Sequence, residues 1–85
     1  MSRPMSEVLS IVLARGELIS SVLIGLDDCL KYGEITRVEH TTANRMIGRW
    51  MAAHPAIVDM PFSAKKESLK SFIRGVKKNE SLSIR

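Results

Sequence analysis

The sequence predicts an all-α fold, a small bundle of three main helices. Apolar residues recur with a helical period through most of the chain, and Gly33 and Pro55 separate segments of helical length. Of the 85 residues, 45% are hydrophobic and 26% are charged, as in one folded domain. We therefore expect a single helical domain over residues 1–78 and a frayed tail over residues 79–85.

The first helix is expected over residues 4–32. Pro4 suits the first turn of a helix, and Gly33 suits the position just after the last turn. The apolar stripe between them is broken mainly at Arg15 and Gly16. Because glycine destabilises a helix interior by about 1 kcal/mol, we expect a helix that is either long or kinked near Gly16.

The apolar stripe of this first helix allows two interpretations. It is either the inner face of the domain or, in part, a surface for self-association, because two shorter helices can cover most of such a stripe and leave some of it exposed. The residues that would mediate a homo-oligomeric contact are Met5, Val12, Ile19, Leu23, Leu26 and Leu30.

The second helix is expected over residues 34–54 and ends before Pro55, because the residue preceding a proline is disfavoured in helical geometry. Its predicted apolar face consists of Ile35, Val38, Thr42, Met46, Trp50 and Ala53. Its predicted polar face consists of Arg37, Thr41, Asn44, Arg45 and Arg49. Residues 56–62 are expected to form an extended connection to the third helix.

The third helix is expected to begin at Ser63, a good N-cap, and to end near residue 78. Leu69, Phe72, Ile73 and Val76 share its apolar face. Its basic face consists of Lys65, Lys66, Lys70, Arg74, Lys77 and Lys78. The net charge of +4 is uneven along the chain: −2 over residues 1–34, +1 over 35–64 and +5 over 65–85. This basic face is either a polyanion-binding surface or a solvated outer face.

Residues 36–50 permit a second hypothesis, a helix-turn-helix motif in which Thr41 and Thr42 begin a recognition helix. The run 47–50, Ile-Gly-Arg-Trp, is similar to the Ile-x-Arg-Trp ending of some recognition helices. The competing interpretation is one uninterrupted amphipathic helix over residues 35–53. The residues that would read DNA are Arg37, Asn44, Arg45 and Arg49.

Several kinds of chemistry find no support in the sequence. A single cysteine, Cys29, cannot form an internal disulfide or a cysteine-based zinc cluster, and His40 and His54 lack the spacing of a metal-binding pair. No glycine-rich phosphate loop and no catalytic motif is present. We expect no enzymatic activity, no cofactor and no metal. We read no signal peptide or transmembrane segment, so we expect a cytoplasmic protein.

These observations together favour a non-enzymatic, small regulatory or inhibitory binding protein. It would engage a macromolecule through the apolar surface of the first helix and the basic face of the third. We favour a protein partner with an acidic surface over nucleic acid, and we expect neither a membrane nor a small-molecule substrate. The alternative is a DNA-binding transcriptional regulator that uses the second helix.

Overall fold

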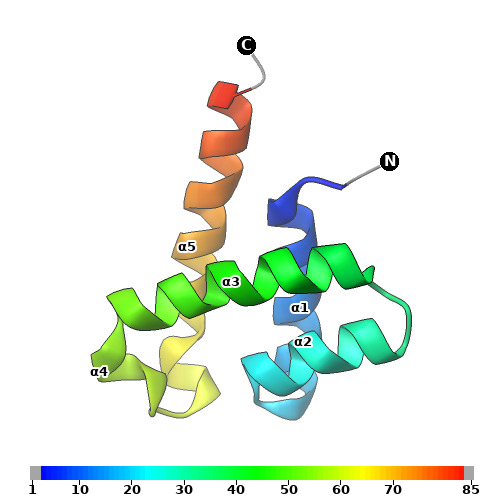
Figure 1. Cartoon of the computed structure of the whole chain (residues 1–85). Helices are drawn as coiled ribbons and strands as arrows, with labels where there is room; N and C mark the ends of the chain where they lie inside the picture. The colour runs from blue at the N-terminus through cyan, green and yellow to red at the C-terminus, as the bar shows by residue number, and fades with distance from the viewer. Residues whose placement is uncertain (1–2, 84–85) are drawn as a thin grey trace.

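A computed structural model describes residues 3–83, which form five helices and no strand. The helices are α1 (Met5–Ile19), α2 (Val22–Lys31), α3 (Arg37–Ala53), α4 (Pro55–Val58) and α5 (Phe62–Ser83). α3 crosses in front of α1 and α5 in Figure 1 and contacts both α1 and α2. The predicted all-α class is confirmed. The predicted number of helices is wrong, because the first segment contains two helices and α4 is an additional one.

The break in the first segment lies at Ser20 and Ser21, not at Gly16. Ser20 ends α1 in the left-handed conformation, with φ of 57°. Ser21 is extended, and its side chain accepts a hydrogen bond from the backbone N–H of Ile24 at 3.2 Å. The serine thereby caps a new helix, and the chain bends by 112° between α1 and α2.

Gly16 has a packing role instead. A Cβ atom placed on Gly25 of α2 would lie 2.8 Å from the backbone nitrogen of Gly16 and 3.0 Å from its Cα. The two glycines therefore allow the backbones of α1 and α2 to touch where the helices cross. The prediction of a kink near Gly16 is corrected on this basis. The predicted stop at Gly33 is confirmed, since α2 ends at Lys31 and Gly33 has φ of 75°.

α3 is one uninterrupted helix that begins with a capping box. The side chain of Thr36 accepts from the N–H of Glu39 at 3.1 Å, and the Glu39 carboxylate accepts from the N–H of Thr36 at 2.8 Å. The helix continues through Thr41 and Thr42, so the turn that a helix-turn-helix motif requires within residues 36–50 is absent.

The buried face of α3 is rotated from the predicted one. Trp50 is buried as expected, but Ala43 and Ile47 lie beside it in the core, whereas Val38 is 75% exposed. The polar face was predicted correctly: its five residues, Arg37, Thr41, Asn44, Arg45 and Arg49, are all exposed.

The predicted extended connection is also corrected. Pro55 occupies the first turn of the short helix α4, where a backbone N–H would have no hydrogen-bond partner within the helix, so the proline costs no hydrogen bond. α5 begins at Phe62, one residue before the predicted start, and runs to Ser83. Residues 79–83 therefore continue the helix, and residues 84 and 85 of the predicted tail lie outside the described residues.

The core is mainly aliphatic, with two buried aromatic side chains, Trp50 and Phe62. Trp50 is 1% exposed, and its indole N–H donates to the hydroxyl of Ser68 on α5 at 3.2 Å. The other buried apolar residues are Val8, Leu9, Val12, Leu13, Val22, Leu26, Cys29, Ile35, Ala43, Ile47, Phe62, Leu69 and Ile73. Because this core draws on the inner faces of α1, α2, α3 and α5, the outer face of α3 is left to the solvent.

An ion pair fixes the N-terminal end of α3. Arg3 donates to both carboxylate oxygens of Glu39, at 2.7 and 3.2 Å, and to the backbone carbonyl of Glu34 at 2.8 Å. The Arg3 guanidinium, together with the backbone N–H of Thr36, lowers the pKa of Glu39 from 4.5 to about 2. The one carboxylate of α3 is therefore already engaged on the inner side of the helix.

Candidate macromolecule-binding surface

Three arginines line the outer face of α3. Arg37, Arg45 and Arg49 are all exposed, and with Thr41 they follow one another at four-residue intervals. Residues four apart lie on the same side of a helix and about 6 Å apart along its axis. The sequence therefore places three guanidinium groups within one exposed strip of the helix. We call this strip, with Asn44 and Gly48 that lie in it, the arginine face.

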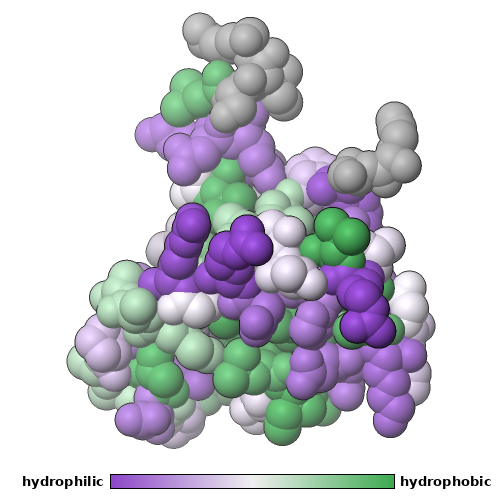
Figure 2. Space-filling view, in the orientation of Figure 1, coloured by the Kyte–Doolittle hydropathy of each residue, from purple (hydrophilic) through white to green (hydrophobic). Residues whose placement is uncertain are grey.

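The positive charge of the arginine face is not neutralised within the part of the chain that the structure describes. None of its three arginines pairs with a carboxylate there. Glu39, the only acidic residue of α3, is 8% exposed and binds Arg3. Asp27 of the neighbouring α2 binds His40, with 2.9 Å between its Oδ1 and the Nε2 of the histidine. In Figure 2 the most hydrophilic side chains of the visible face gather over α3.

The middle of the arginine face is open. Gly48 lies in the interior of α3 and is exposed, and a Cβ placed on it would meet no atom within 4 Å. Packing within the protein therefore does not require a glycine here, in contrast to Gly16 and Gly25. An interior glycine destabilises a helix by about 1 kcal/mol relative to alanine. The position of Gly48 on the outer surface of α3 was not predicted from the sequence.

The predicted basic face of α5 is divided by the structure into two groups. The first group is half-buried and bonded within the domain. Lys65 donates to the carbonyl of Val58 at 2.9 Å, Lys66 pairs with Glu17 at 3.6 Å, and Lys70 lies 3.6 Å from Glu67. Lys65 and Lys66 connect α5 with neighbouring helices, and Lys70 contacts the preceding turn of α5 itself.

The second group, Arg74, Lys77 and Lys78, is exposed. Arg74 donates to the hydroxyl of Ser71 at 3.0 Å, and within residues 3–83 none of the three forms an ion pair with a carboxylate. Only half of the predicted basic face is thus available to a partner.

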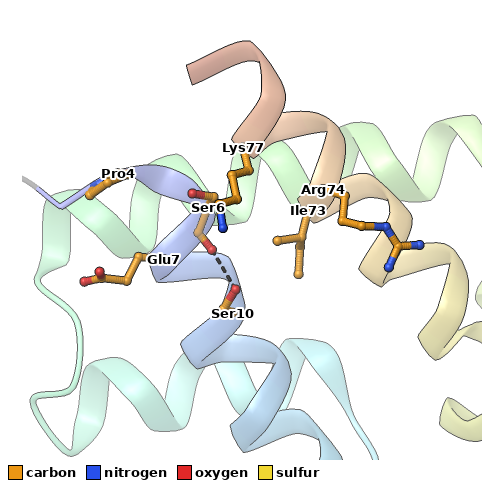
Figure 3. A pocket seen from close by; sticks show the side chains of 7 residues that line it. All are labelled: Pro4, Ser6, Glu7, Ser10, Ile73, Arg74 and Lys77. Carbon is orange, nitrogen blue, oxygen red and sulfur yellow. Dashed lines mark hydrogen bonds between the residues drawn. The ribbon is translucent and has the colours of Figure 1, made fainter. Parts of the chain in front are cut away.

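Arg74 and Lys77 border a shallow groove of about 510 Å³ between the start of α1 and α5. Figure 3 shows Ser6 and Ser10 on the α1 side of this groove, with the Ser10 hydroxyl donating to the Ser6 carbonyl at 2.8 Å. Its lining residues are Pro4, Ser6, Glu7, Ser10, Ile73, Arg74 and Lys77. Glu7 adds a negative charge to the wall, so the groove is less uniformly positive than the arginine face.

The N-terminal end of α1 beside this groove is already satisfied by a carboxylate. Glu80 of α5 accepts from the backbone N–H of Ser6 at 3.0 Å and from its hydroxyl at 2.5 Å. Burial alone would raise the pKa of Glu80, but these hydrogen bonds outweigh it and leave the pKa below its ordinary value. Sequence reasoning missed this contact because 74 residues separate the two partners.

The six residues predicted for self-association do not form one exposed surface. Val12 and Leu26 are each 1% exposed and belong to the core, and Met5 and Leu30 are half-buried against it. Only Ile19 and Leu23 are exposed, at 38% and 47%. Most of the apolar stripe is therefore the inner face of the domain.

The titratable groups singled out in the sequence are held in local contacts. Cys29 is buried, which raises the pKa of its thiol, and its Sγ lies 3.9 Å from the carbonyl of Ile11. The Nδ1 of His54 lies 2.9 Å from the carbonyl of Trp50. Over residues 3–83, no three histidine, cysteine or acidic side chains come together in an arrangement that could hold a metal ion.

In the described part of the chain no single helix has the length and apolar character needed to cross a membrane. Only α1 and α2 counted together have the required length and apolar character, and the chain bends by 112° between them.

Comparison of the chain with protein-family models, with curated proteins and with solved structures gave no match.

Proposed function

We propose that this protein is a non-enzymatic binding protein that engages a polyanionic macromolecule through the arginine face of α3. The observation that carries the proposal is the set of three exposed arginines, Arg37, Arg45 and Arg49, which pair with no carboxylate among residues 3–83. Guanidinium groups bind phosphates and carboxylates through paired hydrogen bonds, which favours their use in recognising anions.

The extended shape of the surface supports a large ligand. From Arg37 to Arg49 the helix advances about 18 Å at 1.5 Å per residue. A small anion could reach only one or two of these side chains, whereas a polymer with regularly spaced charges could reach all three. The arginine face is also convex, since it is the outer side of a helix, and small-molecule sites are usually concave.

Two observations favour α3 over the basic face of α5. Three of the six cations on α5, Lys65, Lys66 and Lys70, already make contacts within the domain. The groove beside the remaining ones includes the carboxylate of Glu7. A protein with an acidic surface docking on Arg74, Lys77 and Lys78 is the second candidate, supported by the exposure of those three side chains.

Salt elution from immobilised heparin distinguishes the two candidates. One variant carries Arg37→Gln, Arg45→Gln and Arg49→Gln, and the other carries Arg74→Gln, Lys77→Gln and Lys78→Gln. Both lose three positive charges at exposed positions, so their net charges match. We expect the α3 variant to elute at a clearly lower salt concentration than the α5 variant. Equal elution, or earlier elution of the α5 variant, would contradict the proposal.

A further inference from the structure

We infer that the polyanion is duplex DNA, with α3 lying in the major groove; this inference rests on the proposed function. α3 contains 17 residues and is about 25 Å long, with a diameter of about 10–12 Å including side chains. The major groove of B-DNA is about 12 Å wide and admits one α-helix. At a rise of about 3.4 Å per base pair, the helix could follow roughly seven base pairs.

The arrangement of side chains around α3 suits such a groove. Successive residues turn by about 100° around a helix, which places Thr41, Arg45 and Ala52 within about 20° of the centre line of the outer face and Gly48 about 40° from it. Arg37 lies to one side of this line and Arg49 to the other, and both are exposed. The small side chains of Thr41, Gly48 and Ala52 let the helix approach the base edges, while the arginines at the two sides are positioned to reach the phosphates of the two strands.

Asn44 adds a group that can read bases. Its exposed amide lies on the same outer face as the arginines, and asparagine pairs with adenine through two hydrogen bonds in the major groove. An arginine can contact guanine in the same way. The arginine face thus combines phosphate-binding and base-reading side chains.

The same face offers a protein partner few anchors besides its charge. Hot-spot residues of protein interfaces are enriched in Trp, Tyr and Arg, and of these three types the arginine face exposes only arginine. Val38, at 75% exposure, is the only large apolar side chain exposed on α3, and it lies beside the centre line. Duplex RNA fits less well than DNA, because its major groove is deep and too narrow for side chains to read.

Substitution of Gly48 tests the inference without disturbing the fold. Gly48→Leu places a bulky side chain on the arginine face, between the arginines, where a Cβ meets no atom within 4 Å. Gly75→Leu is the matched control, because Gly75 of α5 is equally open. Fluorescence anisotropy with a short labelled duplex of mixed sequence gives the affinity of each variant, and circular dichroism verifies that both are folded.

We expect the wild-type protein to bind the duplex and Gly48→Leu to weaken the binding at least about tenfold, with Gly75→Leu unchanged. Equal affinities for the two leucine variants would overturn the inference. So would equal or tighter binding to duplex RNA, or equal competition by polyglutamate. If the wild-type protein is retained on heparin through the arginine face but does not bind duplex DNA, the inference fails and the proposed function stands. If the heparin experiment gives the opposite order of elution, the proposed function itself fails.

Discussion

Gly25 of α2 lies directly against Gly16 of α1. A Cβ on Gly25 would come within 2.8 Å of the Gly16 nitrogen, 3.0 Å of the Gly16 Cα and 3.3 Å of the Val12 carbonyl oxygen. All three of these atoms belong to the backbone of α1, so no side chain can move aside to make room. This contact sets the crossing of α1 and α2, and its energetic consequence can be measured.

Gly25→Ala should destabilise the domain by about 1–3 kcal/mol, because the backbones of α1 and α2 must separate to admit the methyl group. Gly48→Ala is the matched substitution at an open position and should stabilise it by about 0.5–1 kcal/mol through helix propensity alone. Urea denaturation followed by circular dichroism measures both changes. Two changes of the same sign would contradict the assigned roles of these glycines.

The carboxylate of Glu80 should stabilise the packing of α5 on α1. Glu80→Gln weakens the acceptor that caps Ser6 at the start of α1, and it should cost about 1 kcal/mol, the usual contribution of a helix cap. Glu67→Gln removes the same charge from an exposed position of α5, where the pair with Lys70 should contribute less than about 0.5 kcal/mol. A loss of stability no greater for Glu80→Gln than for Glu67→Gln would show that the cap is unimportant.

Acid should destabilise the protein through Glu39. The folded-state pKa of Glu39 is lowered to about 2 from 4.5, so the folded state favours the charged carboxylate. Its contribution to stability is therefore fully present above pH 4.5 and is lost as the pH falls toward 2. Melting temperatures across this range should decline less steeply for Glu39→Gln than for the wild type.

Arg3→Gln removes the main cause of the lowered pKa of Glu39, so it should also flatten the decline in acid. Parallel melting curves for the wild type and both variants would mean that the Arg3–Glu39 pair does not contribute to acid sensitivity.

Two leucines of α2 test which members of the apolar stripe are internal. Leu26 is 1% exposed, and Leu26→Ala should cost about 2–5 kcal/mol because it leaves a cavity in the core. Leu23 is 47% exposed, and Leu23→Ala should change the stability of the monomer by only about 0.5 kcal/mol. Chemical denaturation at two protein concentrations measures both. A concentration-dependent loss of stability in Leu23→Ala alone would instead indicate that this exposed residue mediates self-association.

The helical class and the helix ends at Gly33 and Pro55 could be predicted because local chemistry determines them. The terminator Gly33, the proline at Pro55 and the apolar face of α5 each act over a few residues. The role of Gly16 could not be predicted, because the same residue breaks an isolated helix and permits a close crossing, and only the partner Gly25 decides between the two. Ser20 and Ser21, which end α1 and begin α2, lay inside a continuous apolar pattern that concealed the break.

The candidate site likewise has a part that the sequence predicted and a part that it did not. The exposure of Arg37, Arg45 and Arg49 follows from helical periodicity and was predicted correctly. The availability of the α5 lysines was not, because Lys65 and Lys66 contact Val58 and Glu17, and these contacts depend on how the helices pack. Periodicity identifies which residues share a face, whereas tertiary contacts determine which of their charges remain unpaired.

The salt dependence of duplex binding measures how many phosphates the arginine face neutralises. If three phosphates are neutralised, the logarithm of the association constant should fall against the logarithm of the salt concentration with a slope of about −2.7, or about 40-fold between 50 and 200 mM salt. Each substitution among Arg37→Gln, Arg45→Gln and Arg49→Gln should make this slope less steep by about one. Lys77→Gln and Lys78→Gln should leave it unchanged. A slope that responds to the α5 lysines and not to the α3 arginines would contradict the account.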